Sequence, residues 1–453
     1  MKVEITSIKD IYQHLEKLTK LEKIKVSGWV KSVRESKEVV FIILNDGSTN
    51  DNLQIVISQT YFLQNELLKK INFGSGLLVS GNIILTPQRK QSCELQATEI
   101  IFVNSVAEDY PFQKKDISLE TVRNYPHLRA KTNYFLVLFR LRHSISKAVH
   151  DFFHQEGFYY VSTPIITGSD AEGAGEFFSI DDNEKDPFFP KKASLTVSGQ
   201  LQTEALAQGL GKVYTFSPCF RAEKSNTTRH LAEFYMIETE MVCADLATII
   251  SLSEKLIKGV IKYILDSNIS DLEFLESYHQ KQLINKLKNL LNSDFKIIKY
   301  AEVIEILEIN KQNFVFNDIK WGMDLQSEHE KYLCKHFNSL VFVTNYPINL
   351  KAFYMKNNLD KRTVDCFDLL IPEIGELIGG SMREDNYEVL KNKAQKIGID
   401  SDNLGWYLDL RRYGYISSGG FGLGLERLIM FISGTDNIRD TIAFPRYPKH
   451  LET

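Results

Sequence analysis

A charged stretch between two hydrophobic runs constrains this chain more than any other feature. It reads FRAEKSNTTRHLAEF and occupies residues 220–234. So much charge beside core strands predicts a multiply charged ligand. Arg221, Arg229 and His230 suit the phosphates of a nucleotide, because a guanidinium is planar, permanently charged and matches phosphate oxygens two at a time. Phe234 would stack on the base. Taken alone, the stretch also fits a solvated hairpin with a few surface ion pairs.

A glycine-rich segment favours the nucleotide interpretation. Residues 417–429 read SSGGFGLGLERLI and lead into an apolar helix pattern that carries Glu426 and Arg427. Glycine lets the backbone approach a ligand closely, and the start of a helix favours anions. The segment lacks the strand, helix and distant acidic residue that identify a dinucleotide fold. It therefore predicts an anion site of another kind.

Together the two segments resemble motifs 2 and 3 of the class II aminoacyl-tRNA synthetases. The first matches the FRxE signature and the second the GLER signature, and the matching residues are Phe220, Arg221, Glu223, Gly424, Leu425, Glu426 and Arg427. Motif 1 is matched more weakly by a helix pattern at 141–153 and the following GFYYVSTPIIT, with Pro164 at the expected place. The resemblance covers nearly the whole chain. Three strings, TVSGQLQTEALA at 196–207, RHLAEF and the closing DNIRDTIAFPR, resemble the asparaginyl branch of the family.

The order of apolar patterns predicts an α+β chain that begins with a β barrel. Residues 1–107 read as five short strands, with a helical stretch, LQNELLKKI, between Ile57 and Phe73. Five strands with one helix after the third resemble an OB fold. Residues 108–131 are rich in Pro, Lys, Asp and Arg and are predicted to be a linker. The resemblance implies a class II catalytic domain at 132–453, an antiparallel or mixed sheet flanked by helices, with a helical insertion at about 245–345.

The barrel is expected to bind the anticodon of a tRNA. Phe41 and Gln54 lie on adjacent predicted strands, and Arg34 is placed in the loop between the first two strands. Aromatic stacking on a splayed base contributes about 1–3 kcal/mol, and an amide can read a base edge. In related synthetases these strand positions hold the anticodon, so the resemblance implies this role for all three residues. Without it, Phe41 reads better as a core residue.

For the nucleotide, the resemblance implies two steps. The carboxylate of L-asparagine attacks the α-phosphate of ATP with loss of pyrophosphate, and the 3′-terminal ribose of tRNA then takes the aminoacyl group. Positioning and charge stabilisation dominate such chemistry. Arg221 is expected on the α-phosphate and the reacting carboxylate. The other implied contacts are Arg229 and His230 on the β- and γ-phosphates, Phe234 and Arg427 on the two adenine faces (Arg427 alternatively on the γ-phosphate), Glu223 on the adenine amino group, and Gly424 in the same site.

Two carboxylates are expected to hold Mg²⁺ beside the phosphates. Asp368 and Glu376 lie eight residues apart across LLIPEIG. Mg²⁺ needs hard oxygen ligands and usually keeps several waters. Read without the resemblance, both are ordinary surface residues. The resemblance implies that Glu376 also contacts ATP.

Amino-acid recognition is expected to rest on a smaller set of residues. The resemblance implies that Glu172 and Gln200 hold the substrate ammonium, with Ser198 close by, and that Arg383 reaches the side-chain oxygen. If residues 230–238 form a strand, its side chains alternate. In that case His230, Phe234 and Glu238 share one face, which brings Glu238 to the pocket, while Glu233 points away.

Position 203 is expected to decide between asparagine and aspartate. Aspartyl enzymes carry a lysine there, whereas this chain has Thr203. Asparagine offers its carbonyl oxygen to Arg383 and its two amide hydrogens to Glu238. Aspartate would place its carboxylate against Glu238 with no lysine to relieve the repulsion, and repulsion of the wrong ligand is a common device for specificity. Thr203 therefore predicts asparagine.

Composition limits the compartment and the partners. Five scattered cysteines without CxxC spacing favour neither a disulfide framework nor a zinc site. A net charge of -4 requires any nucleic-acid surface to be a local basic face. No run of about 18 apolar residues and no secretory start is seen, so we expect a cytoplasmic protein without a membrane segment. In this class motif 1 helices form the dimer interface, which implies a homodimer.

Three other functions stay open at this point. An aspartyl enzyme, including a form that charges both tRNAs, is disfavoured by Thr203 and by RHLAEF. A ligase such as the ammonia-dependent asparagine-forming enzyme would have no need of a base-reading barrel. A noncatalytic RNA-binding paralogue would have lost Arg221 or Arg427, and both are present.

Overall fold

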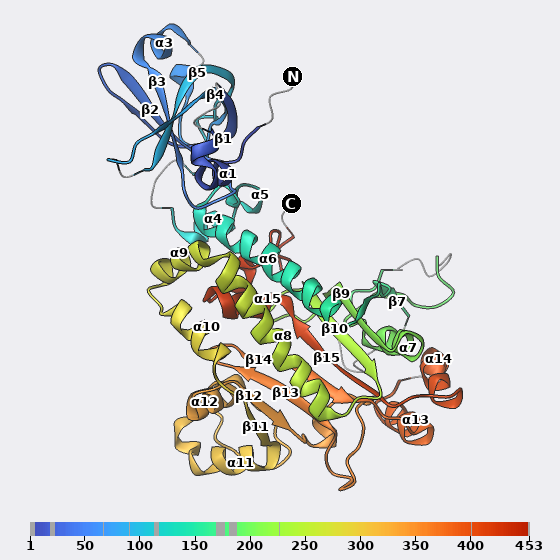
Figure 1. The fold of residues 1–453 in the computed structure, drawn as a ribbon. Helices are drawn as coiled ribbons and strands as arrows, with labels where there is room; N and C mark the ends of the chain where they lie inside the picture. Colours follow the sequence, from blue (N-terminus) through green and yellow to red (C-terminus); the bar gives the residue numbers. More distant parts are fainter. Residues whose placement is uncertain are drawn as a thin grey trace. The chain divides into compact units, whose positions relative to one another are not determined.

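The structure is a computed structural model that describes residues 5–18, 23–66, 68–89, 91–112, 117–168, 177–180, 188–225, 227–399 and 401–451, with only the backbone of residues 401–403. The chain forms two compact units, Met1–Val137 and Leu138–Glu452. Figure 1 labels the elements of both.

The first unit contains the predicted barrel. Its strands are β1 (Ile24–Glu35), β2 (Val39–Asn45), β3 (Leu53–Ser58), β4 (Gly76–Leu85) and β5 (Cys93–Asn104). They close in the order β1-β2-β3-β5-β4, and α3 (Gln59–Gln64) follows the third strand. Alternate residues point inward, so that Val26, Ile42 and Ile55 are fully buried in one core. The five-stranded barrel with its single helix after β3 confirms the predicted OB fold.

Short helices of the first unit depart from the sequence predictions. The stretch LQNELLKKI is not one helix, because α3 ends at Gln64 and a separate 3-10 turn covers Leu68–Lys70. Two unpredicted helices, α1 (Ile8–Gln13) and α2 (Leu15–Leu18), precede the barrel. Ser7 caps α1, which buries Ile8 and Ile11 in the barrel core. The predicted linker also contains helices, α4 (Leu119–Arg123) and α5 (Pro126–Arg129).

The second unit is built on an eight-stranded mixed sheet of order β11-β12-β13-β14-β15-β10-β9-β6. Only the outermost pairs, β11 with β12 and β6 with β9, are parallel. This arrangement confirms the predicted mixed sheet. The strands are β6 (Tyr159–Tyr160), β9 (Lys212–Phe220), β10 (Glu233–Val242), β11 (Lys296–Lys299), β12 (Val341–Thr344), β13 (Cys366–Ile371), β14 (Gly375–Met382) and β15 (Ser418–Gly424), and β7 (Ile166–Thr167) pairs separately with β8 (Ser194–Leu195).

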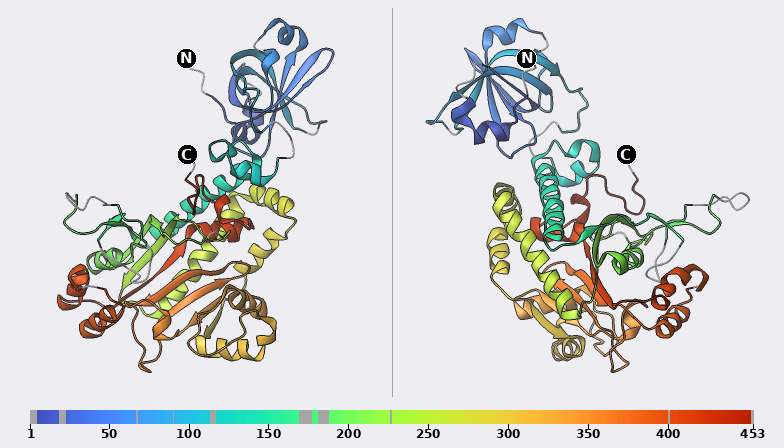
Figure 2. Two further views of the ribbon diagram at one scale, coloured as in Figure 1. Left: turned by 180° about the vertical axis from the view of Figure 1, so that it is seen from behind. Right: turned by 45° about the vertical axis from the view of Figure 1, so that its right-hand side comes forward.

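Long helices cover one face of this sheet. In Figures 1 and 2, α6 (Asn133–Gln155) and α8 (Leu246–Ser267) lie side by side across it. The Phe153 ring stacks on Tyr214 of β9 with centroids 4.6 Å apart, and a Cβ added to Gly419 of β15 would meet Ile249 of α8 at 2.5 Å. Side chains of the neighbouring register positions must therefore point to the opposite face, which these two long helices leave uncovered.

The remaining helices frame the sheet at its two ends. They are α9 (Ile269–His279), α10 (Leu283–Leu291), α11 (Tyr300–Ile309) and α12 (Ser327–Phe337) on one side, and α7 (Gln200–Leu210), α13 (Tyr387–Lys396), α14 (Ser401–Arg412) and α15 (Leu425–Ser433) around the other strands. The region 245–345, predicted as helical, also supplies the edge strand β11 and its neighbour β12. No helix in the described ranges has the length and apolar character needed to cross a bilayer.

Candidate active site

Two pockets open on the uncovered face of the sheet and share part of their walls. The larger has a volume of about 1030 Å³ and the smaller about 170 Å³. Five residues line both, namely Arg221, Glu223, Met236, Glu376 and Gly422. Arg221 thus stands at the junction between a compartment rich in cations and a larger polar compartment.

Strand periodicity explains which side chains reach the pockets. Phe234, Met236 and Glu238 alternate along β10 and all line one of the two pockets, as the predicted alternation requires. The strand begins only at Glu233, so the condition that residues 230–238 form a strand holds from Glu233 onward. His230 reaches the smaller pocket from the preceding turn.

The glycine-rich segment forms strand β15 and runs directly into α15. Gly420 and Gly422 lie between β14 and β10, where side chains would collide with neighbouring atoms. A Cβ at Gly420 would come within 1.8 Å of the Thr239 carbonyl oxygen, and one at Gly422 would come within 3.0 Å of Met236. Gly420 therefore allows close packing against β10, and Gly422, which lines both pockets, leaves room in them.

The start of α15 is anchored by a buried carboxylate. Glu426 accepts the backbone N–H of Tyr235 at 3.0 Å and the guanidinium of Arg142 at 2.8 Å. This fixes the first turn of the helix against β10. Arg427, the next residue, projects into the smaller pocket and donates to the Glu376 carbonyl oxygen at 2.8 Å.

The cationic side chains that the sequence analysis assigned to one nucleotide site all line the smaller pocket. Its lining includes Arg221, Arg229, His230 and Arg427, and the Phe234 ring lies 5.4 Å from the Arg221 guanidinium carbon. The guanidinium of Arg229 donates to the Glu373 carbonyl at 3.0 Å and to the Ile374 carbonyl at 3.3 Å. These bonds hold it at the β13–β14 turn, on the rim of the pocket.

The pKa of His230 reflects its burial and the charges around this pocket. Burial lowers its pKa below the ordinary value of 6.5, and the charges of Arg427, Arg221 and Arg229 lower it further, against the opposing effect of Glu223. Its Nδ1 lies 2.6 Å from the Thr227 hydroxyl. A neutral imidazole surrounded by guanidinium groups indicates a place prepared for negative charge.

Asp368 and Glu376 lie on one face of the sheet. Leu370 shares a face with Asp368, two residues earlier on β13, and Leu370 pairs with Glu376 on β14. Beyond an irregularity at Leu369/Leu370, Asp368 itself pairs with Gly379. A Cβ on Gly379 would lie 3.0 Å from Glu376 Oε1 and 3.6 Å from Asp368 Oδ1. The two carboxylates are therefore neighbours.

Lys351 is a pocket residue that the sequence analysis missed. Its ammonium group lies 2.7 Å from Asp368 Oδ1 within the larger pocket. Burial raises the pKa of Asp368 to about 6 in spite of this lysine. No spacing rule connects residues 351 and 368, because the 3-10 turn at Ile348–Leu350 positions the lysine.

At the far end of the larger pocket, Glu238 meets the start of α7. It accepts the Gly199 backbone N–H at 2.8 Å and the hydroxyl of Ser198. Gln200, the next lining residue, donates its amide to Glu204 at 2.9 Å. Its Oε1 is buried and has no hydrogen-bond partner among the residues that the structure describes. An orphaned buried acceptor at a cavity wall indicates a donor on the ligand.

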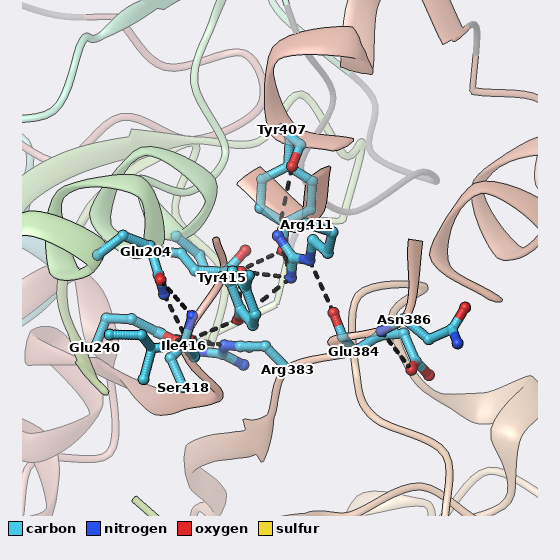
Figure 3. A network of polar contacts seen from close by, with 12 residues as sticks. Glu204, Glu240, Arg383, Glu384, Asn386, Tyr407, Arg411, Tyr415, Ile416 and Ser418 are labelled. Atoms are coloured by element: carbon cyan, nitrogen blue, oxygen red, sulfur yellow. Dashed lines mark hydrogen bonds and ion pairs between the residues drawn. The ribbon is translucent and has the colours of Figure 1, made fainter. Parts of the chain in front are cut away.

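Arg383 is held in the same compartment by Glu240. Figure 3 shows this ion pair inside a larger polar network. Burial acts to lower the pKa of Arg383, but the carboxylate of Glu240 more than offsets it, so the guanidinium stays charged. Burial raises the pKa of Glu240 to about 7 against the influence of Arg383. Glu240 was not predicted, although the period of two that identified Glu238 extends to it.

Thr203, predicted to decide the choice of amino acid, lies behind the pocket wall. Thr203 is buried in α7 but does not line either pocket, and its hydroxyl donates to the Gly199 carbonyl at 2.8 Å. It lies one helical turn after Gly199, whose backbone N–H donates to Glu238. Glu172 lies outside the described residues.

The barrel presents two of its three predicted residues as expected. Phe41 and Gln54 alternate with buried neighbours and are half-buried on the outer face of β2 and β3. Arg34 does not lie in a loop, because β1 extends to Glu35, and it pairs in register with Phe41. Its guanidinium carbon lies 4.8 Å from the Phe41 ring. Gln54 donates to Glu94 at 3.1 Å.

Comparison with known proteins relates both units to one family. Residues 118–448 match the family model of the class II tRNA synthetases (D, K and N), and residues 24–103 match that of the OB-fold nucleic acid binding domain. An asparagine–tRNA ligase of Mycoplasma capricolum subsp. capricolum is 49% identical over 98% of this chain and 99% of its own length. A counterpart from Microcystis aeruginosa is 46% identical over 98% of both.

Solved structures agree with this relationship. The asparaginyl-tRNA synthetase from Pyrococcus horikoshii complexed with asparaginyl-adenylate is 30% identical, with a TM-score of 0.89 over 100% of both chains. An aspartyl tRNA synthetase from Entamoeba histolytica, at 21% identity and a TM-score of 0.79, shares the fold alone.

Proposed function

Because this chain belongs to the class II tRNA synthetases (D, K and N), with asparagine–tRNA ligases among its full-length relatives, we propose that its two pockets activate L-asparagine with ATP. The chain is an asparagine–tRNA ligase. It forms asparaginyl adenylate and pyrophosphate, then transfers the asparaginyl group to tRNA and releases AMP. One observation carries the assignment of the pockets: Arg221 lines both the cation-rich compartment and the polar one.

The smaller pocket is the ATP site. Arg221 binds the α-phosphate and the attacking carboxylate, where negative charge concentrates as the new bond forms. Arg229 and His230 hold the outer phosphates, and Phe234 stacks on one face of adenine. Arg427 covers the other face, and Glu223 accepts from the adenine amino group. The pKa of His230 is lowered first by burial and then by the charges of Arg427, Arg221 and Arg229, and these converging charges support the assignment.

Asp368 and Glu376 fit a magnesium ion by their chemistry. Both supply carboxylate oxygens, and both flank Gly379, whose missing side chain leaves room between them. When bound, Mg²⁺ would neutralise phosphate charge beside Arg221. Lys351 balances the charge of Asp368 in the protein without ligands.

The larger pocket selects the amino acid. Arg383 donates to the side-chain carbonyl of asparagine, and Glu238 accepts its amide hydrogens. Gln200 accepts from the substrate ammonium, which is supported by its orphaned Oε1. Aspartate is rejected because its second carboxylate would face Glu238, while Arg383 is already neutralised by Glu240.

The barrel, which we assign to residues 1–107, binds the anticodon. Phe41 stacks on a base, Gln54 reads a base edge, and Arg34 binds the neighbouring phosphate or base. Their common outer face supports this role. Residues 108–131 would connect the barrel to a catalytic domain at 132–453.

We also infer a homodimer and a cytoplasmic location. The edge strand β6 exposes Tyr159 and Tyr160 at 60% and 53% of their surface, which supports a partner at this end of the sheet. None of the five cysteines, all of them described, forms a disulfide, as suits a reducing compartment.

Exchange of pyrophosphate into ATP in the presence of asparagine tests the catalytic assignment. Arg221→Ala should lower the exchange rate by at least about 100-fold, the typical cost of removing a charge-stabilising group. Arg412→Ala is the matched control, because this arginine is half exposed and paired with Asp409 outside both pockets. Exchange within tenfold of the unaltered protein in Arg221→Ala would contradict the assignment.

A further inference from the structure

A buried polar network lies behind the amino-acid pocket and contains a carboxylate that the proposed reaction does not use. Glu204 of α7 is fully buried and forms an ion pair with Arg411 of α14, which is buried too. It also accepts the Tyr415 hydroxyl at 2.9 Å and the hydroxyl of Tyr407. Figure 3 shows these side chains converging on it. Burial raises the pKa of Tyr407 well above 10, so its hydroxyl remains a donor.

The same carboxylate receives the amide of Gln200. Gln200 Nε2 donates to Glu204 Oε2 at 2.9 Å. An ionised carboxylate only accepts hydrogen bonds, whereas a carboxamide has one donating and one accepting end. The NH₂ end of Gln200 must therefore face Glu204. Its Oε1 is left buried, without a partner among the described residues, on a side chain that lines the pocket.

The network also reaches the group that is assigned to the substrate side chain. The Tyr415 hydroxyl lies 2.8 Å from the Ser418 hydroxyl, which donates to Glu240 at 2.9 Å. Glu240 in turn holds Arg383. Arg411 adds a second link, because its Nε donates to the Glu384 carbonyl at 2.8 Å, one residue beyond Arg383. The proposed ammonium and side-chain contacts are thus fixed by one continuous structure.

We propose that Glu204 is a positioning residue for recognition of the substrate ammonium: it fixes the orientation of the Gln200 amide so that Oε1 accepts from that group. The inference rests on the proposed function of the larger pocket. A purely structural role, in which Glu204 only fastens α14 to α7, would also explain the ion pair. That role gives no reason for the effect of Glu204 to depend on the substrate ammonium.

The test compares two ligands that differ only by the ammonium group. Asparagine is measured by its KM in pyrophosphate exchange, and succinamate, which is asparagine without its amino group, by its inhibition constant in the same assay. In Glu204→Gln the new side chain can donate, so the Gln200 amide loses its fixed orientation. We expect the KM for asparagine to rise by about tenfold, the range for the loss of a hydrogen bond to a charged group. The inhibition constant of succinamate should rise by less than about twofold. The KM for ATP should stay within about threefold.

A second pair of variants tests whether Glu204 acts through Gln200. The preference for asparagine is the ratio of the succinamate inhibition constant to the KM for asparagine. Gln200→Ala should reduce this ratio by a similar factor, and adding Glu204→Gln should reduce it no further. If Glu204→Gln is too unstable because Arg411 is left charged and buried, Glu204→Gln combined with Arg411→Met removes both charges and should give the same loss of preference.

Asp271→Asn is the matched control, because Asp271 forms an ion pair with Arg140 that lines neither pocket. It should change stability but not the ratio of the two ligands. If the Glu204 variants raise the KM for asparagine and the inhibition constant of succinamate by the same factor, or raise neither, the inference is overturned. Absence of asparagine-dependent exchange in the unaltered protein would instead overturn the proposed function.

Discussion

The carboxylate of Glu240 accepts three hydrogen bonds from the guanidinium of Arg383. Arg383 Nε lies 3.1 Å from both carboxylate oxygens, and Nη2 lies 2.8 Å from Oε2. A fourth hydrogen bond goes to Ser381, whose hydroxyl accepts from Nη1 at 2.6 Å. The guanidinium that we assign to the asparagine side chain is therefore fixed before any substrate arrives, and preorganisation of this kind favours binding.

Replacing this carboxylate tests its importance. Glu240→Gln removes one charge of a buried pair, which should destabilise the protein by on the order of 3 kcal/mol. It should also raise the KM for asparagine by at least about tenfold, because Arg383 loses a fixed position. Steady-state exchange kinetics would show this with the KM for ATP unchanged. Glu254→Gln, which alters a partly exposed i,i+4 pair on α8, is the control and should affect neither. Equal changes in both KM values would contradict the role.

Thr203→Lys tests the basis of amino-acid choice. The lysine would stand on α7 one turn after Gly199, and its ammonium group would pair with Glu238. Glu238 is the acceptor that we assign to the asparagine amide. Asparagine activation should fall by at least about tenfold, and aspartate activation should rise. Thr203→Val keeps the shape of the side chain and should stay within about threefold. Unchanged asparagine kinetics in Thr203→Lys would show that position 203 has no influence on this pocket.

The lowered pKa of His230 predicts a dependence of ATP binding on pH. Its imidazole is neutral in the free protein at pH 7, because its pKa lies below 6.5. The triphosphate would raise this pKa, so ATP binding takes up a proton and tightens as the pH falls through about 6.5. Calorimetry at pH 6.5 in two buffers of different ionisation enthalpy measures the uptake. His230→Gln should lower it, which separates the histidine from the titration of ATP itself. Identical uptake by both proteins would exclude His230 as the source.

The barrel face predicts a separation of tRNA binding from adenylate formation. Phe41→Ala should raise the KM for tRNA by about tenfold, as expected for the loss of one stacked base. Asparagine-dependent exchange should not change, because it needs no tRNA. Tyr61→Ala removes a partly exposed aromatic ring from α3 and serves as the control. A fall in exchange, or an unchanged KM for tRNA in Phe41→Ala, would contradict the anticodon assignment.

Sequence patterns over a few residues predicted the strands of the barrel and several of the side chains that line the pockets. The barrel strands followed from apolar runs between turn residues, and the pocket face of β10 followed from a period of two. The grouping of Arg221, Arg427 and His230 followed from a resemblance in two short segments. Each of these features depends on residues that are close in sequence.

Features that depend on long-range pairing were missed. Glu376 lies beside Asp368 because it pairs with Leu370, and no pattern in LLIPEIG indicates the register of that pairing. Lys351 and Glu204 are recognisable only through partners on other elements. The helix α1 was missed because its few apolar residues lie ahead of a run of strands, and its burial is decided by the barrel.

The most direct test of the account is the choice between asparagine and aspartate by the purified protein. Pyrophosphate exchange into ATP should depend on asparagine, with kcat/KM for aspartate lower by about 10³-fold or more, as buried polar pockets can achieve. Exchange supported equally by aspartate, or by neither amino acid, would contradict the assignment of Glu238, Arg383 and Arg221 to one pocket.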